Sequence, residues 1–578
     1  MCGIYGITED NRKLIYDYIQ LCKHRGPNGS DIWNNKFITL GHNLLAITDD
    51  PTSSRQPWIT PAGNILVYNG ECFNYYDLLK EYKDRFTPKT SCDTELIAWG
   101  LDTFGYEFIR KLDSMHGIAY YDIRRNHLWL SRGYSGIKPI YYAEIEKGLI
   151  FGSEIKGLLD HVPNARSVDR LALNCMSVTG INVLRNTFFS SIKKVMPAET
   201  LIYDVANKRF VQSYKEHITP KSNNILDPQE FRDAVKKTVR MTSLGKKEIG
   251  IFLSGGLDSS IVALEMKNLH GRVKTFTNRI VPEIVIGSES MNSDAGNAGR
   301  LAKEFGFNHQ EVIVDPAVVM EHWDQSIYYM EQPVYNQSQV MYYYTNKIMS
   351  QNGIVVTMAG DMGDELLGGY TKYWKMRLGN DRGIVLGKWE DVIDIWLKRI
   401  KRPIELKNHS INEEEIKHEL LKLYTESQLW NPNDPVGSYM ALDCATQVPN
   451  EFFSRNDTYG MAFGMEGRFP LATKFFTRYA MSIHSKYKFG EDKDQTKLPT
   501  KKSYKGILPD YIINKYKSGW TCPITQWQKT NSDLKNFLNK IDQRSSCFDR
   551  ILVQGQKEKA KVPALILKSW AQKYNMQL

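Results

Sequence analysis

A cysteine at position 2 is the first residue with clear chemical potential. So small a residue favours removal of Met1, which would give Cys2 a free α-amino group. An α-amine with a pKa of about 8 can act as the general base for the thiol of the same residue. Thiolate attack on an amide creates an oxyanion, which needs hydrogen-bond donors. The Asn69 amide and the Gly70 N–H, expected at a tight turn after a strand, suit that role; a plain hairpin turn is the alternative.

A second chemical motif is the heptapeptide SGGLDSS at residues 254–260, between an apolar strand and a helix. Paired glycines let backbone N–H groups approach an anion, and the N-terminus of the helix adds a favourable dipole. Asp258 can hold Mg²⁺ against phosphates. No Gly-Lys-Ser/Thr closes the loop, so it is not a Walker A loop. The motif predicts a site that grips a leaving pyrophosphate while attack occurs at the α-phosphate of ATP.

A third motif, AGDMGDE at residues 359–365, follows another apolar strand. Asp361 and Asp364 lie three residues apart on a glycine-rich turn, which suits metal and phosphate chemistry. A solvated acidic turn that caps a helix is the alternative interpretation.

The elements around Cys2 are predicted to form a β-rich domain with two helices, near residues 75–82 and 93–104. Strand-like runs separated by Gly, Asn and Asp occur at residues 37–40, 65–68, 127–130 and 149–151. The polar, proline-bracketed segment 217–228 is the best linker candidate.

After this segment, strands and helices alternate. This pattern predicts a doubly wound parallel sheet that binds ligands at the carboxyl ends of its strands. Beyond about residue 380 the pattern is mainly helical. The predicted strands are 249–253, 273–277, 309–314 and 354–358, and the predicted helices are 261–269 and 295–305, with Asp294 just before the second helix.

Composition excludes several classes of protein. The chain has 578 residues, of which 42% are hydrophobic and 24% charged, so two to four domains are expected. It has no apolar run of membrane-spanning length and no signal peptide, which argues against a membrane location. Eight scattered cysteines without a CxxC pair fit a reducing cytosol. The net charge of +10 is diffuse, so nucleic-acid binding is not expected.

The N-terminal residues resemble the class II glutamine amidotransferase domain. The shared motifs, in that family's order, are MCGIYGI, His24-Arg25-Gly26-Pro27, Tyr68-Asn69-Gly70-Glu71, Asp93 with Glu95, and residues 151–156 (FGSEIK). The resemblance implies an αββα layered domain over residues 2–215 with Cys2 as nucleophile. It also implies an oxyanion hole at Asn69 and Gly70, and glutamine contacts from Asn69, Gly70, Glu71 and Asp93.

Three positions depart from the pattern of that family. Leu44 stands where an Arg usually clamps the α-carboxylate of glutamine, so glutamine binding is expected to be weaker unless another cation substitutes. Arg55 is the nearest candidate in the sequence. Asn28 and Gly133 replace aspartates that are common in the family.

Residues 216–578 resemble the synthetase half of asparagine synthetases. The motifs are SGGLDSS, Asp294, GDMGDELLGGY, Arg455-Asn456-Asp457, Gly467-Arg468-Phe469-Pro470 and Lys517-Ser518-Gly519-Trp520. The resemblance implies ATP and Mg²⁺ as cofactors, an acyl-adenylate intermediate, and ammonia passing through an internal tunnel. Lys517 would neutralise charge on the α-phosphate, and Asp361 would accept a proton from ammonia. Pyrophosphate or ATP contacts would come from Phe252, Ser254, Gly255, Gly256, Asp258, Ser259, Asn278 and Gly360, with Asp258 and Asp364 at the metal.

Aspartate is the acceptor expected from the family. However, the segment Met330–Val334 departs from the Glu-Thr-Tyr-Asp run of the best-known members, so another carboxylate, such as a sugar uronic acid, stays an alternative. The Cys2 nucleophile disfavours a β-lactam-forming enzyme. A pseudoenzyme and a nucleic-acid thiolase are the remaining rivals. The expected partners are small molecules, and a homodimer is left open.

Overall fold

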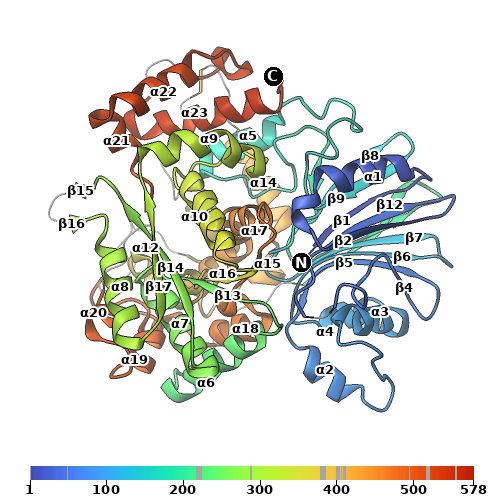
Figure 1. Ribbon diagram of the computed structural model, residues 1–578, viewed down its shortest axis with the longest axis horizontal. Coiled ribbons are helices and arrows are strands. Elements are labelled where there is room, and N and C mark those ends of the chain that lie inside the picture. The colour runs from blue at the N-terminus through green and yellow to red at the C-terminus, as the bar shows by residue number, and fades with distance from the viewer. Residues whose placement is uncertain are drawn as a thin grey trace.

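A computed structural model describes residues 2–48, 50–216, 224–286, 289–377, 386–398, 404, 406–407, 412–493, 495–515, 521–553 and 556–578. The N-terminal half contains two six-stranded antiparallel sheets, and the C-terminal half contains a five-stranded parallel sheet. Helices surround the parallel sheet and extend to the C-terminus (Figure 1). The two halves pack against each other along one side of each.

The two antiparallel sheets form a sandwich. The first sheet has the order β10–β8–β9–β1–β3–β2 and the second has the order β12–β11–β7–β6–β5–β4. Their bounds are β1 Cys2–Ile7, β2 Gly29–Asn34, β3 Thr39–Leu44, β4 Trp58–Ile59, β5 Ile65–Cys72, β6 Ser114–Asp122, β7 His127–Arg132, β8 Tyr141–Ile145, β9 Gly148–Gly152, β10 Lys193–Lys194, β11 Glu199–Asp204 and β12 Arg209–Lys215.

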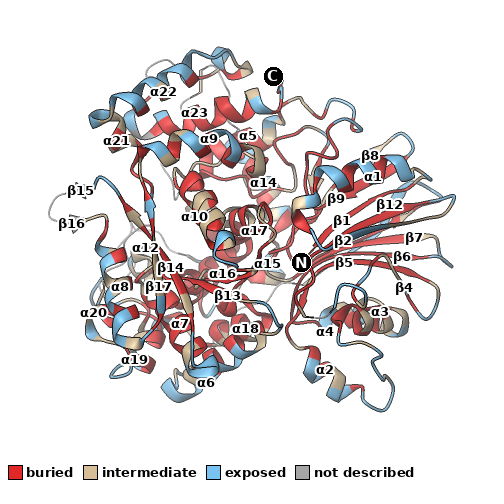
Figure 2. Cartoon of the chain, viewed as in Figure 1, coloured by how far each residue is buried: buried red, intermediate tan, exposed pale blue. Residues whose placement is uncertain are grey.

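A hydrophobic core between the two sheets holds the sandwich together. Ile4 of β1, Val67 of β5 and Leu130 of β7 belong to this core and are all fully buried. Helix α1 (Arg12–Leu21) covers the outer face of the first sheet, while α3 (Asp93–Phe104) and α4 (Tyr106–Lys111) cover the second. Figure 2 shows that the strands of both sheets are mostly buried. This layering confirms the expected αββα architecture.

The parallel sheet of the C-terminal half has the order β17–β14–β13–β18–β19, and every neighbouring pair of strands is parallel. The fold class predicted for this half is therefore confirmed. The strand bounds are β13 Ile249–Phe252, β14 Lys274–Ile280, β17 Asn308–Val314, β18 Val356–Met358 and β19 Glu466–Arg468, beside a small ribbon of β15 Val285–Ile286 and β16 Glu289–Ser290.

Helices make up most of the remaining chain. Those around the parallel sheet are α6 Pro228–Thr242, α7 Leu257–His270, α8 Ser293–Phe305, α9 Pro316–Met330, α10 Gln339–Gln351 and α11 Gly363–Leu367. The later helices are α12 Thr371–Arg377, α13 Trp389–Leu397, α14 Glu413–Leu423, α15 Glu426–Leu429, α16 Pro435–Gln447, α17 Ser454–Met461, α18 Lys474–Ser482, α19 Leu498–Tyr504, α20 Asp510–Ile513, α21 Ile524–Thr530, α22 Ser532–Gln543 and α23 Glu558–Lys573. The N-terminal half also has α2 Tyr75–Glu81 and α5 Arg170–Thr179. None of the described helices is both long and apolar enough to cross a membrane.

Several predicted boundaries were wrong. Residues 37–40 are not a strand of their own, because β3 begins at Thr39 and runs to Leu44. The helix expected from residue 261 begins four residues earlier, directly after the glycine pair. Asp294 does not precede α8 but lies in its first turn. Strands β1 and β6 were missed because they are buried along their whole length and so lack the apolar–polar alternation of half-buried strands. Residues 217–223 of the predicted linker lie outside the described part of the chain.

Candidate active sites

Cys2 lies in β1, where it pairs with Leu44 of β3. Burial raises the pKa of its thiol above the ordinary value, so the thiol is protonated at neutral pH and needs a base to become a nucleophile. The backbone nitrogen of Cys2 donates a hydrogen bond to Asn69 Oδ1 at 3.0 Å. The atom that would become the free α-amine is therefore fixed beside Asn69.

Asn69 and Gly70 do not form the tight turn expected after a strand. Both lie within β5, where they pair with Gly117 and His116 of β6. Asn69 is fully buried, and within the described part of the chain no group accepts a hydrogen bond from its Nδ2. A buried donor without a partner costs about 1–3 kcal/mol and needs an explanation, such as a ligand. A Cβ at Gly70 would lie 2.0 Å from the Met115 carbonyl oxygen, so only glycine fits there.

Two buried carboxyl groups lie close to this thiol. Glu71 pairs with Arg468 Nη2 at 2.9 Å, and Asp93 accepts hydrogen bonds from the Tyr68 hydroxyl at 3.1 Å and the Cys72 N–H at 2.9 Å. Burial raises the pKa of both carboxyl groups. An acid-rich surrounding of this kind suits a ligand that brings an ammonium group.

The cation expected for a glutamine carboxylate is not at the usual position. Leu44 packs with Cys2 and Ala46 in a small apolar cluster. Arg55 is exposed at the surface. The guanidinium beside Glu71 is that of Arg468, from the C-terminal half. Its other donors bind Glu466 Oε1 at 2.5 Å, the Thr242 carbonyl at 2.9 Å and the Leu244 carbonyl.

The other two departures have clear local explanations. Asn28 Oδ1 accepts a hydrogen bond from the Ala46 N–H at 3.0 Å and so fixes the strand end after β3. At Gly133 a Cβ would lie 2.8 Å from the backbone nitrogen of His116, so a side chain there requires the backbone to shift.

A cavity of about 180 Å³ opens at the carboxyl ends of β13 and β18. This is the edge of a parallel sheet at which ligands bind in doubly wound folds. The structure places eight of the predicted residues in its wall: Phe252, Ser254, Gly256, Asp258, Ser259, Gly360, Asp361 and Asp364.

The serine–glycine loop is held open at the start of α7. Ser254 N–H donates to Ser259 Oγ at 3.1 Å, and Ser259 Oγ donates to the Gly256 carbonyl at 3.1 Å. Gly255 has φ +68°, and a Cβ there would lie 2.2 Å from the Asp294 carbonyl oxygen. Among the described residues no side chain caps the helix at Gly256, which leaves its N-terminal N–H groups available to an anion.

Asp258 and Asp364 converge on one cation, the ammonium group of Lys497. Lys497 Nζ lies 2.6 Å from Asp364 Oδ1 and also contacts Asp258 Oδ2. Glycines leave room for these carboxyl groups, since a Cβ at Gly363 or Gly369 would collide with Asp258 or Asp364. No group of three acidic, histidine or cysteine side chains within the described ranges could hold a metal alone. The pair fits Mg²⁺, which takes one or two carboxylates and completes its shell with phosphates and water.

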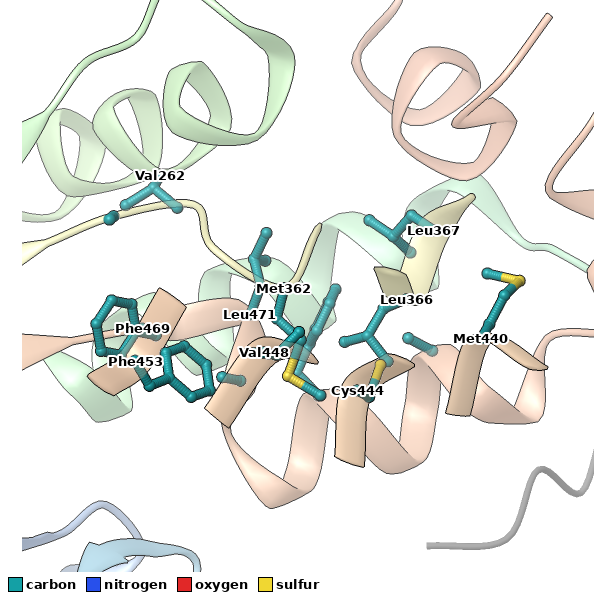
Figure 3. Packing of buried hydrophobic residues seen from close by; sticks show 14 of the residues in the cluster. Val262, Met362, Leu366, Leu367, Met440, Cys444, Val448, Phe453, Phe469 and Leu471 are labelled. Carbon is teal, nitrogen blue, oxygen red and sulfur yellow. The ribbon is translucent and has the colours of Figure 1, made fainter. Parts of the chain in front are cut away.

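Apolar side chains pack the acidic segment, residues 359–365, against the hydrophobic core. Met362, in the left-handed conformation with φ +73°, points into the core together with Leu366 (Figure 3). They pack in the same cluster as Cys444 and Val448 of the helical layer (Figure 3). Burial of Met362 and Leu366 on either side of Asp364 helps to hold that carboxylate at the cavity.

Two of the described predicted residues are not in the cavity wall, and a third predicted residue lies outside the described part of the chain. Gly255 belongs to the serine–glycine loop but does not line the cavity. Asn278, on β14, accepts a hydrogen bond from Thr345 Oγ1 at 2.7 Å and does not reach the cavity. Lys517 lies outside the described residues.

Several cavity residues were missed by reasoning from the sequence. The principal ones are Tyr342, Lys497, Lys501 and Lys515, whereas Asn456 belongs to the Arg455-Asn456-Asp457 motif. The three lysines lie in the stretch 486–517, where basic residues are densest. Because this stretch also carries four acidic residues, its charge alone did not identify a site. Lys515 contacts Asp294 and donates to the Gly255 carbonyl at 3.4 Å.

Arg468 connects the two sites through a single residue. Its side chain holds Glu71 beside Cys2. Its backbone carbonyl accepts a hydrogen bond from the Ala359 N–H at 3.4 Å, at the end of β18 where the acidic segment begins. The GRFP motif thus lies at the boundary of the two halves.

Comparison with known proteins agrees with this arrangement. A family model described as asparagine synthase matches residues 230–575, and one described as a glutamine amidotransferase domain matches residues 1–215. Glutamine-hydrolyzing asparagine synthetase 1 of Bacillus subtilis (strain 168) is 24% identical over 94% of this chain and 90% of the relative. Glutamine-hydrolyzing asparagine synthetase B of Escherichia coli (strain K12) is 26% identical over 65% of this chain and 66% of the relative. The chain therefore belongs to the asparagine synthase family.

Proposed function

We propose that the chain is a glutamine-dependent amidotransferase that activates a carboxylate with ATP and releases AMP and pyrophosphate. The observation that carries this proposal is the pair Asp258 and Asp364 converging beside an uncapped helix N-terminus in the 180 Å³ cavity. In the same chain, the buried Cys2 thiol and the buried Asn69 Nδ2 donor suit the release of ammonia from glutamine. The relatives named above are glutamine-hydrolyzing synthetases, which supports the same reaction class.

The first reaction takes place at Cys2. After removal of Met1, the α-amine takes the thiol proton, and the thiolate attacks the side-chain amide of glutamine. Asn69 Nδ2 and the Gly70 N–H stabilise the oxyanion. Collapse of this intermediate releases ammonia, and water then hydrolyses the thioester to glutamate. Glu71 and Asp93 hold the glutamine.

The second reaction takes place in the cavity. The acceptor carboxylate attacks the α-phosphate of ATP, which gives an acyl-adenylate and pyrophosphate. Ser254, Gly256 and Ser259 hold the leaving pyrophosphate at the N-terminus of α7. Mg²⁺ bound between Asp258 and Asp364 would neutralise phosphate charge. Ammonia attacks the acyl carbon, Asp361 accepts its proton, AMP leaves, and Lys517 offsets charge on the α-phosphate.

Aspartate is the acceptor that we favour, which would make asparagine the product. The identity of 24–26% to the two synthetases described above fixes the family more firmly than the acceptor. In the divergent segment, Glu331 accepts the N–H groups of Ile155 and Lys156 from the N-terminal half, whereas Gln332 donates to Ser454 Oγ of α17 at 3.1 Å. A sugar uronic acid is the second candidate, and Leu44 motivates a third, a pseudoenzyme with weak use of glutamine.

The deciding experiment supplies ATP, Mg²⁺ and ammonium with a panel of acceptors: aspartate, glutamate and uronic acids. Mass spectrometry identifies the amide, and nucleotide analysis separates AMP from ADP. We expect an amide and AMP in equal amounts with one acceptor. ADP and orthophosphate as products would overturn the proposal, and absence of pyrophosphate release with every acceptor would favour the pseudoenzyme.

We also propose a cytosolic location and small-molecule substrates. All eight cysteines are free thiols, and seven of them are buried, as expected for a protein kept in a reducing compartment. Neither activity requires nucleic acid or a membrane. A homodimer stays open as an assembly of this chain.

A further inference from the structure

A second cavity lies between the two halves, apart from both proposed sites. It measures about 20 Å³ and is bounded by Arg132 of β7 and Lys194 of β10 from the N-terminal half. Gln332, Asn450 and Ser454 close it from the C-terminal half. A space of this size holds one water molecule or one monatomic ion, and it excludes sulfate or a carboxylate metabolite.

Arg132 brings a permanent positive charge to this cavity. Its side chain is 4% exposed and donates to the Val195 carbonyl at 2.9 Å and the Gly136 carbonyl at 2.5 Å. Its Nε–H is buried and has no acceptor among the residues that the structure describes. A guanidinium does not lose its proton in a protein, so this charge persists.

Lys194 adds a second buried cation. The residue is 6% exposed, and Nζ donates to the Asn182 carbonyl at 3.1 Å and to Asn450 Oδ1 at 2.5 Å. These bonds use two of the three N–H groups of an ammonium. Burial, reinforced by the charge of Arg132, lowers the pKa of Lys194 to about 7.

The acids around the cavity already have cationic partners. Glu331 lines the cavity, but its carboxylate lies 3.2 Å from Lys156 Nζ and accepts the N–H groups of Ile155 and Lys156. The other nearby pairs are Arg25–Glu154 at 3.2 Å, Lys138–Asp457 at 3.0 Å and Arg185–Glu199 at 2.6 Å. These acids are engaged by other cations, and among the described residues no acid forms an ion pair with Arg132 or Lys194.

We propose that this interdomain cavity binds one monatomic anion of chloride size between Arg132 and Lys194. An unpaired buried charge is strongly destabilising, and a counter-ion that bonds to both cations removes that cost. Deprotonation of Lys194 alone would leave the charge of Arg132 uncompensated. Because both halves of the chain supply the wall, the anion ties the two halves together.

Bromide tests the location of the site directly, because it replaces chloride and scatters anomalously. Crystals of the full chain grown with bromide as the main anion should show an anomalous peak between Arg132 Nε and Lys194 Nζ. Density at that point without an anomalous signal would mean a water molecule and would overturn the proposal.

Thermal unfolding in solution tests the same site. Replacing gluconate with chloride at constant ionic strength should raise the unfolding midpoint of the unaltered chain by about 2 °C or more. Lys194→Met should abolish this rise, whereas Lys193→Met, which removes the neighbouring 44% exposed ammonium, should retain it. An equal rise in all three proteins would contradict the proposal. If Lys194→Met does not fold, the bromide map of the unaltered chain decides.

Discussion

The two proposed sites are built in opposite ways. The donor site around Cys2 and Asn69 is formed inside strands β1 and β5, so it depends on how the two sheets of the sandwich pack face to face. The ATP site is formed by two loops at the carboxyl ends of β13 and β18, which need buried anchors such as Met362. The first site is therefore enclosed by paired strands, whereas the second leaves an open cavity for a large ligand.

The charged residues at the two proposed sites also differ. Glu71 and Asp93 give the donor site buried acids, which suit the ammonium group of an amino acid. Lys497, Lys501 and Lys515 line the ATP cavity together with four aspartates, a mixed lining that suits a polyphosphate held with a divalent cation. The four predictions below test this division of roles.

The largest expected effect comes from removing the thiol. Cys2→Ala should lower glutamine-dependent synthesis by more than about 10³-fold, because it removes the proposed nucleophile of the donor site. Ammonium-dependent synthesis should be unchanged, since the cavity is untouched. Both rates are measured by amide formation, with Cys547→Ala as the control for loss of a thiol elsewhere. Equal losses with the two nitrogen donors would break the comparison.

The reciprocal change is Asp258→Asn. It should lower synthesis about 10²–10³-fold with either nitrogen donor, because one of two converging carboxylates loses its charge. Hydrolysis of glutamine in the absence of ATP should stay within about twofold of the unaltered chain, an effect below 1 kcal/mol. Asp324→Asn, at an exposed position of α9, is the matched control. A large loss of glutaminase activity would show that the sites are not separate.

A pH-dependent difference in stability is expected at Glu365, behind the ATP site. Burial, with the charge of Asp364 adding to it, raises the pKa of Glu365 from 4.5 to about 8, and the Tyr370 hydroxyl donates to it at 2.8 Å. A carboxyl group with a raised folded-state pKa stabilises the fold fully below pH 4.5 and loses that contribution as the pH rises to 8.

Glu365→Gln keeps an acceptor for the Tyr370 hydroxyl but removes the carboxyl group that titrates. Relative to the unaltered chain, the variant should gain roughly 3–5 kcal/mol of unfolding free energy between pH 5 and pH 8. Urea unfolding at the two pH values measures the difference. A gain that does not depend on pH would show that Glu365 is already ionised in the folded chain.

The smallest expected effect concerns Arg55, the cation that the sequence offered in place of the missing clamp. Its side chain is exposed, so Arg55→Ala should change the KM for glutamine by less than about twofold, which corresponds to less than 0.5 kcal/mol. Steady-state glutaminase kinetics check this expectation. A tenfold higher KM would identify Arg55 as a carboxylate clamp that closes on the substrate.

The strand–loop–helix context of the SGGLDSS segment was predicted correctly, because it lies in contiguous residues and is visible locally. The donor site was harder. Asn69 and Gly70 were recognised, but their placement in a turn was wrong, because β5 continues through them and pairs with the fully buried β6. Arg468 and Lys497 were missed as site residues because their partners lie far away in the sequence. Such pairings depend on how the two halves dock, which no local pattern encodes.

Lys497 has a consequence for how the acidic segments are held in place. It adopts a left-handed backbone conformation, with φ +55°, and places its ammonium group between Asp258 of α7 and Asp364 of α11. The lysine therefore crosslinks the starts of three helices, α7, α11 and α19, at one edge of the parallel sheet.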